Sequence, residues 1–149
     1  MKLDYHPPHL ILVHFPSALF PVEFAFAAIG YYRHDLSFSN AAFYVLAAGV
    51  LLGWLAAFAG LIDLSRIPKE KATGQRTGLI HGGLNVLVLS GYTVLAILQY
   101  KAPEISYATV PQLLLKAFLL LLLIAGNYLG GQLVLKYKIG TLKNDKTQS

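Results

Sequence analysis

The sequence contains no cysteine and few charged residues for its length. The absence of cysteine excludes disulfide bonds, thiolate metal sites and covalent c-type haem attachment. Only 13% of the 149 residues are charged, against about 25% in ordinary soluble domains. Hydrophobic residues make up 56% of the chain. A chain with so little polar surface cannot cover itself in water, so we expect lipid to be the solvent for much of it.

Four long apolar stretches indicate four transmembrane helices. They cover residues 10–32, 41–64, 78–100 and 111–137, each near the roughly 20 residues that cross a bilayer. No alternating strand pattern competes, and an open strand edge would leave backbone groups unpaired in hydrocarbon. The residues before the first stretch lack a clear basic n-region, so we expect no cleavable signal peptide. We therefore predict an all-α membrane protein, one four-helix transmembrane bundle over residues 1–149 with a frayed tail at 143–149.

The positive charges predict the orientation of the bundle. Of the 12 lysines and arginines, three fall on one side, namely Arg33, Lys101 and Lys116, and the others fall on the side of both termini. The positive-inside rule places both termini in the cytoplasm, which we take to be that of a bacterium with a multi-pass inner-membrane protein. Because topology explains the basic residues, we expect no nucleic-acid partner.

Polar residues and glycines of all four predicted helices converge near the cytoplasmic face. His14 and His81 each lie about one turn inside the membrane, where a polar side chain needs a partner or a role. Facing helices of a bundle can offer two imidazoles to a cofactor or metal in the core. His9 lies one turn before His14, and Asn85 lies one turn after His81 and could orient a ligand. Room for a flat macrocycle would come from Gly60, Gly82, Gly130 and Gly131.

Each of these residues also has a plainer interpretation. Small residues are the usual means by which membrane helices approach one another, and a histidine near an interface is often a simple hydrogen-bonding group. Asp63 and Arg66 are spaced to pair with each other, or Asp63 could accept a hydrogen bond from an imidazole. Glu23, an intramembrane carboxylate, could be protonated or lie on a proton path.

Two local features concern the first two helices. Pro16 and Pro21 each remove a backbone hydrogen bond, so a kink is expected near His14. Ser39 or Asn40 is expected to cap the start of the second helix.

Several segments resemble one bacterial membrane family, domain of unknown function family 2231. The string from His9 through Leu-Ile-Leu-Val to His14-Phe-Pro16 is similar to its H-P-x-L-V-H-F-P opening. The segments 60–64, 81–85 and 130–134 resemble its later helix ends. Some members resemble modules joined to Rieske-type iron–sulfur domains, which implies redox work. Two departures are Leu10 in place of the family's proline and Tyr137 where members often carry a histidine.

These observations favour a b-type cytochrome-like membrane electron carrier. Haem b would be held by His14 and His81 near the cytoplasmic face, and a quinone or redox protein would be its partner. One alternative is a metal-binding or transport protein, with His9, His14, Asp63 and His81 holding a divalent ion. Another is a cofactor-free structural subunit of a larger complex. Neither a nucleophile–base pair nor a phosphate loop is present, so we expect a binding or electron-transfer protein rather than a stand-alone enzyme.

Overall fold

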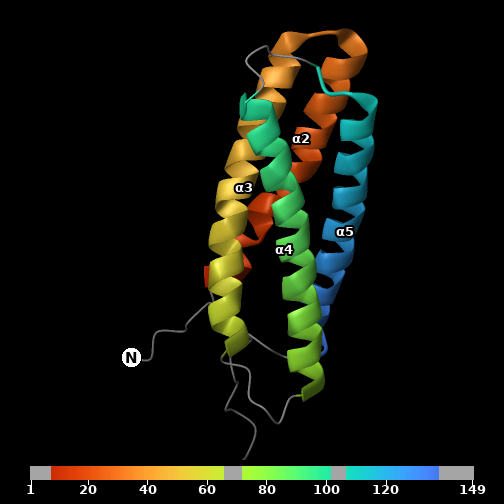
Figure 1. Cartoon of the computed structure of the whole chain (residues 1–149). Coiled ribbons are helices and arrows are strands. Elements are labelled where there is room, and N and C mark those ends of the chain that lie inside the picture. The colour runs from red at the N-terminus through yellow and green to blue at the C-terminus, as the bar shows by residue number, and fades with distance from the viewer. Residues whose placement is uncertain (1–7, 66–71, 102–106, 138–149) are drawn as a thin grey trace, which may run out of the picture.

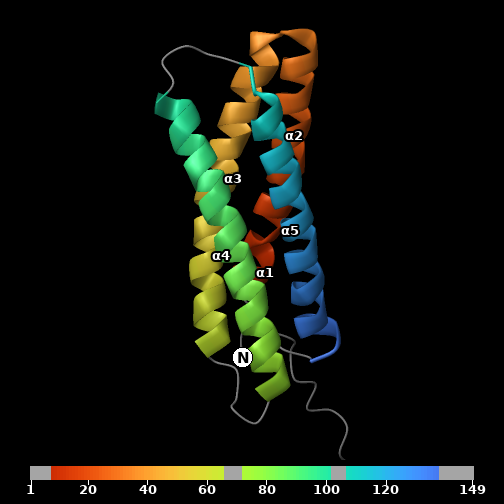
Figure 2. The same ribbon diagram turned by 45° about the vertical axis from the view of Figure 1, so that its right-hand side comes forward.

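A computed structural model describes residues 8–65, 72–101 and 107–137. They form one short helix, α1 (Pro8–Leu12), and four long ones, α2 (His14–Arg33), α3 (Leu36–Ser65), α4 (Ala72–Lys101) and α5 (Val110–Leu135). Figures 1 and 2 show the long helices side by side in an elongated bundle, with α1 below α2 in both views. Contacts join α2 to α3, α3 to α4, α4 to α5 and α5 to α2, which makes a closed ring.

The helices form because the chain must satisfy its own backbone in an apolar solvent. Four segments, of 25, 30, 30 and 26 residues, are long and apolar enough to cross a membrane. Large apolar side chains also face outward, among them Leu51, Leu121 and Ile124. The prediction of an all-α, four-helix membrane bundle is confirmed, and the described ranges contain no strand. Placement of both ends in the cytoplasm stays a prediction.

The turn between α2 and α3 is tight and is closed by Asp35. His34 adopts a left-handed conformation (φ 52°) at the end of α2. The Asp35 carboxylate then accepts hydrogen bonds from the backbone N–H of Ser37 at 2.9 Å and from its hydroxyl at 2.6 Å. The expectation of a cap at Ser39 or Asn40 was therefore wrong, because α3 begins earlier and both residues lie inside it.

The predicted kink near His14 is confirmed as a break at Val13, which separates α1 from α2. Pro16 has no N–H to donate to the carbonyl of Leu12, so the helical hydrogen-bond ladder is interrupted there. Ser17 repairs part of the loss, since its hydroxyl donates to the carbonyl of Val13 at 2.7 Å. The break allows α1 to pack against α3 independently of α2.

A cluster of buried hydrophobic residues lies at mid-height of the bundle. Phe20 of α2 stacks on Tyr92 of α4, with ring centres 3.9 Å apart and planes 4° from parallel. Leu46, Val88 and Leu119 surround this pair, and all are almost fully buried. The stack crosses between helices that are diagonal in the ring, so it fills the centre of the bundle. One cavity lies on each side of this packed layer along the helices.

Candidate functional site

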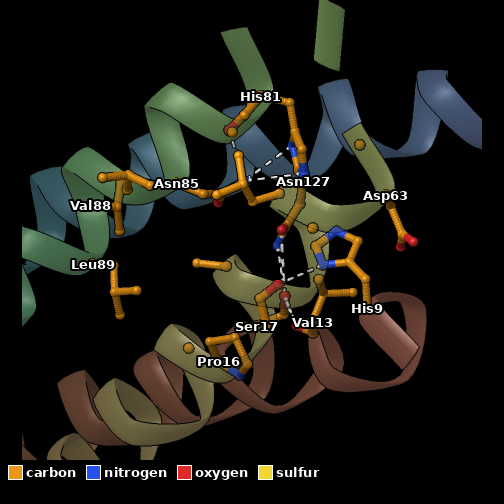
Figure 3. A pocket seen from close by; sticks show the side chains of 18 of the residues that line it. His9, Val13, Pro16, Ser17, Asp63, His81, Asn85, Val88, Leu89 and Asn127 are labelled. Carbon is orange, nitrogen blue, oxygen red and sulfur yellow. Dashed lines mark hydrogen bonds between the residues drawn. The ribbon is translucent and has the colours of Figure 1, made fainter. Parts of the chain in front are cut away.

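The larger cavity has a volume of about 700 Å³ and lies in the half of the bundle that contains α1 (Figure 3). All five helices contribute to its walls. Most of the lining is apolar, and its histidines are His9, His14 and His81. The floor consists of Phe20, Val88 and other residues of the packed layer.

His9 is held against α3 by one hydrogen bond and one glycine. Its Nδ1 lies 2.8 Å from the carbonyl oxygen of Ala56. The ring packs on Gly60, where an added Cβ would come within 2.8 Å of the His9 Cε1. Ala56 and Gly60 are four residues apart, so the carbonyl and the glycine lie one above the other on the same face of α3. Gly60 is therefore required for the close approach of the imidazole.

His81 repeats this arrangement between α4 and α5. Its Nδ1 lies 2.7 Å from the carbonyl oxygen of Gly126, and its Cε1 would lie 2.8 Å from a Cβ added at Gly130. The Nδ2 of Asn85 lies 3.0 Å from the His81 carbonyl oxygen and 3.3 Å from the ring Nε2. In both cases the carbonyl of one small residue accepts a hydrogen bond, and the glycine one turn later makes room for the ring.

The hydrogen bonds determine which ring nitrogen of each histidine carries a proton. A carbonyl oxygen only accepts, so Nδ1 of His9 and Nδ1 of His81 must donate. Nε2 of each neutral ring then keeps its lone pair, which is the state in which imidazole binds a metal. The Nδ2 of Asn85 also lies 3.1 Å from Nδ1 of His81, but a protonated Nδ1 cannot accept from it. The ring centres of His9 and His81 are 6.3 Å apart, with planes at 76°.

His14 is placed differently from its predicted partner His81. It borders the cavity, but its side chain is exposed. His14 lies five positions after His9 and beyond the break at Val13, so the two side chains do not share one helix face. The structure therefore brings His9, rather than His14, beside His81.

Of the other predicted site residues, two glycines leave space at the cavity wall, and Asp63 borders the cavity without accepting a hydrogen bond from an imidazole. A Cβ added at Gly82 or Gly131 would meet nothing within 4 Å, so these glycines leave open space in the cavity wall. Asp63 borders the cavity, but backbone carbonyls and not its carboxylate accept from the imidazoles. Arg66 lies outside the described residues, so its predicted pairing with Asp63 is not described.

The compact metal site considered as an alternative is not assembled. Within residues 8–65, 72–101 and 107–137, no three or more histidine, aspartate or glutamate side chains gather closely enough to hold an ion. His9, His14, Asp63 and His81 all lie in these ranges. They line different parts of the wall of a wide cavity, so the described residues lend no support to that alternative.

Sequence reasoning missed the backbone carbonyls that orient the two imidazoles. The signal was present as a pair of small residues four apart, Ala56 with Gly60 and Gly126 with Gly130. This spacing is typical of close helix packing in membranes. Here the approaching group is an imidazole ring rather than a second backbone. The single tryptophan, Trp54, also borders the cavity and donates to the Thr93 hydroxyl at 3.1 Å.

Glu23 lies outside this cavity, at the level of the packed layer. It is fully buried and forms an ion pair with Lys116 of α5. The sequence analysis grouped Lys116 with Arg33 and Lys101 as a topological charge, and the structure instead places it inside the bundle, where it is 3% exposed.

Comparison with known proteins gives one match. A family model described as "Predicted membrane protein (DUF2231)" matches residues 5–143 of this chain. No curated protein and no solved structure matches it.

Proposed function

This chain belongs to the DUF2231 family of predicted membrane proteins, and we propose that it binds haem between His9 and His81 and carries electrons in the bilayer. The observation that supports this most is the repeated placement of the two imidazoles. Each is fixed through Nδ1 to a backbone carbonyl, so Nε2 is the nitrogen that can accept or bind a metal, and in His81 it lies 3.3 Å from the Asn85 amide nitrogen. Such backbone hydrogen bonds are the usual means by which proteins orient metal-binding histidines.

The spacing of the two rings suits a shared metal ion. A nitrogen ligand lies about 2 Å from its metal, so the centre of each imidazole lies about 3 Å from it. Two rings on opposite sides of one ion therefore have centres about 6 Å apart. The observed separation is 6.3 Å. The residues proposed to hold the haem are His9 and His81, in place of the His14 and His81 expected from the sequence.

The cavity also suits a large, flat, apolar group. Its volume of about 700 Å³ lies within the roughly 300–1,000 Å³ typical of cofactor sites. Gly82, Gly83 and Gly131 leave open space at its wall, where any larger side chain would project. Two ligands and a wide apolar cavity fit a macrocycle better than a bare ion, which needs three or four protein donors.

The chain would bind and tune the group rather than perform chemistry itself. Haem supplies a one-electron couple, and its potential depends on axial ligands and burial. His9 and His81 would hold the iron through Nε2, and the Asn85 amide would then give up its contact with the His81 Nε2 and keep its hydrogen bond to the His81 carbonyl oxygen. The apolar walls would exclude water and lower the local dielectric. A quinone or a membrane redox protein is the proposed partner, and the predicted orientation places the site near the cytoplasmic face of a bacterial inner membrane.

Absorption spectroscopy tests the proposal directly. The protein is produced with ample haem supply, purified in mild detergent, and recorded oxidised and dithionite-reduced. We expect a Soret band with sharp reduced α and β bands, lost in His9→Ala and His81→Ala. The matched control is His14→Ala, which should keep the spectrum. Added haem should also quench the fluorescence of Trp54 in apoprotein, because this residue borders the cavity.

A colourless protein that neither retains nor takes up haem would overturn the proposal. The same contacts then support a structural role, because His9 joins α1 to α3 and His81 joins α4 to α5. In that case His9→Ala and His81→Ala would lower the unfolding temperature of the colourless protein. Loss of the spectrum in His14→Ala, with retention in His9→Ala, would instead restore the pairing expected from the sequence.

A further inference from the structure

A buried ion pair lies near the middle of the bundle, away from the histidine cavity. Lys116 of α5 donates to Oε1 of Glu23 on α2, and both side chains are almost fully buried. The second carboxylate oxygen, Oε2, has no hydrogen-bond partner in the described part of the chain. A buried carboxylate normally has all its oxygens satisfied, because burial of an uncompensated charge is costly. Glu23 is therefore only half compensated as an anion.

A second cavity, of about 280 Å³, extends from Lys116 to the surface at the other end of the bundle. Besides Lys116 and three tyrosines, its polar lining residues are Ser39, Asn40, Gln99 and Gln112. Tyr44 and Tyr100 also line it and are 70% and 79% exposed, so the cavity reaches the outside. Ser39 is 3% exposed, and its hydroxyl has no partner among the described residues. A polar cavity of this size has room for several waters, each of which occupies about 30 Å³.

We propose that Glu23 and Lys116 form a proton-binding site that exchanges protons with water in the smaller cavity. Lys116 lines that cavity and contacts Glu23, so it stands between water and carboxylate. An N–H bond of the ammonium breaks and an O–H bond forms on Glu23. A hydronium proton that arrives through the cavity water then restores the ammonium and leaves a water molecule. The product is a neutral carboxylic acid beside a charged lysine, and the site has taken up one proton.

The neighbours of the pair make this exchange one-sided. From α4, Tyr92 packs beside the pair, and its hydroxyl donates to the Lys116 carbonyl at 3.3 Å. From α3, the Ser39 hydroxyl and the Tyr44 phenol border the same cavity, and Tyr100 and Tyr107 border it near the α4–α5 connection. The stack of Phe20 on Tyr92 separates Glu23 from the histidine cavity. Protons therefore enter from the end that carries the α2–α3 turn.

Infrared difference spectroscopy between acid and alkaline pH detects the proposed proton. We expect a reversible carbonyl-stretch band of a carboxylic acid that grows on acidification and shifts in D₂O. Glu23→Gln should abolish it, and Asp63→Asn, at the far cavity, should not. If Glu23→Gln does not fold, the neutral double variant Glu23→Gln with Lys116→Met takes its place. No haem is needed, so a colourless protein that shows this band refutes only the haem proposal.

A relay variant separates proton exchange from a purely structural ion pair. Lys116→Arg keeps the positive charge, but a guanidinium does not release its proton. After a rapid pH jump, the Glu23 band should appear roughly 100-fold more slowly in Lys116→Arg than in the native chain, as expected when a proton-transfer group is lost. An equal rate in the two proteins would exclude Lys116 as the relay. A spectrum without any pH-dependent, Glu23-dependent band would overturn the proposal entirely.

Discussion

Two adjacent glycines of α5 should respond in opposite ways to the same substitution. In Gly130→Ala the new Cβ would lie 2.8 Å from Cε1 of His81, so the ring must move and its hydrogen bond to Gly126 is stretched or lost. Overpacking costs about 1–3 kcal/mol and the hydrogen bond about 1 kcal/mol, against a helix-propensity gain of about 1 kcal/mol. Gly130→Ala should therefore destabilise the fold by about 1–3 kcal/mol.

Gly131→Ala is the matched control, because its Cβ meets nothing within 4 Å. Only the gain in helix propensity applies, so the apoprotein should become more stable by up to about 1 kcal/mol. The assay is unfolding of apoprotein in mild detergent by added SDS, followed through the fluorescence of Trp54. The reasoning fails if the two variants change the free energy of unfolding equally, since the contact with His81 would then contribute nothing to stability.

Three further results are expected. Lys116→Met should lower the free energy of unfolding by about 3–5 kcal/mol in the same SDS titration, and adding Glu23→Gln should recover most of the loss, because a buried charge without its partner costs more than a neutral pair. Hydrogen bonds from Ser37 hold the pKa of Asp35 below its usual range, so its stabilising effect is complete above the ordinary aspartate pKa and is lost as the pH falls through the lowered value. In a pH series of thermal unfolding, the unfolding temperature of the native chain should show this loss at low pH, and that of Asp35→Ala should not. His14→Ala should leave the unfolding temperature unchanged, because its side chain is exposed.

The architecture could be predicted from the sequence for a physical reason. In lipid the backbone must satisfy its own hydrogen bonds, so four apolar stretches of sufficient length become four helices. The hydrophobicity of a segment is the sum of its residues' contributions, so it can be read without knowing which other helices the segment contacts. The break near His14 was equally local, because a proline without an N–H has the same effect in any helix.

The pairing of side chains between helices could not be predicted in this way. Depth in the membrane correctly grouped His9, His14 and His81 at one end of the bundle, but depth does not give the direction in which a side chain points. The break at Val13 and the packing of α1 on α3 decide that His9 approaches His81 and that His14 faces outward. The partner of Glu23 was missed for the same reason, since Lys116 was grouped with Arg33 and Lys101 by its position in the chain.

By itself the sequence determined that this protein spans a membrane with four helices, because apolar length and proline are local properties. It also determined which residue types are available at each depth. Only the tertiary structure decided which of them meet. Rotation of each helix about its axis sets which carbonyl accepts from an imidazole, which glycine leaves room for a ring, and which lysine neutralises a carboxylate. Those rotations follow from the packing of all the helices together, and no single segment contains that information.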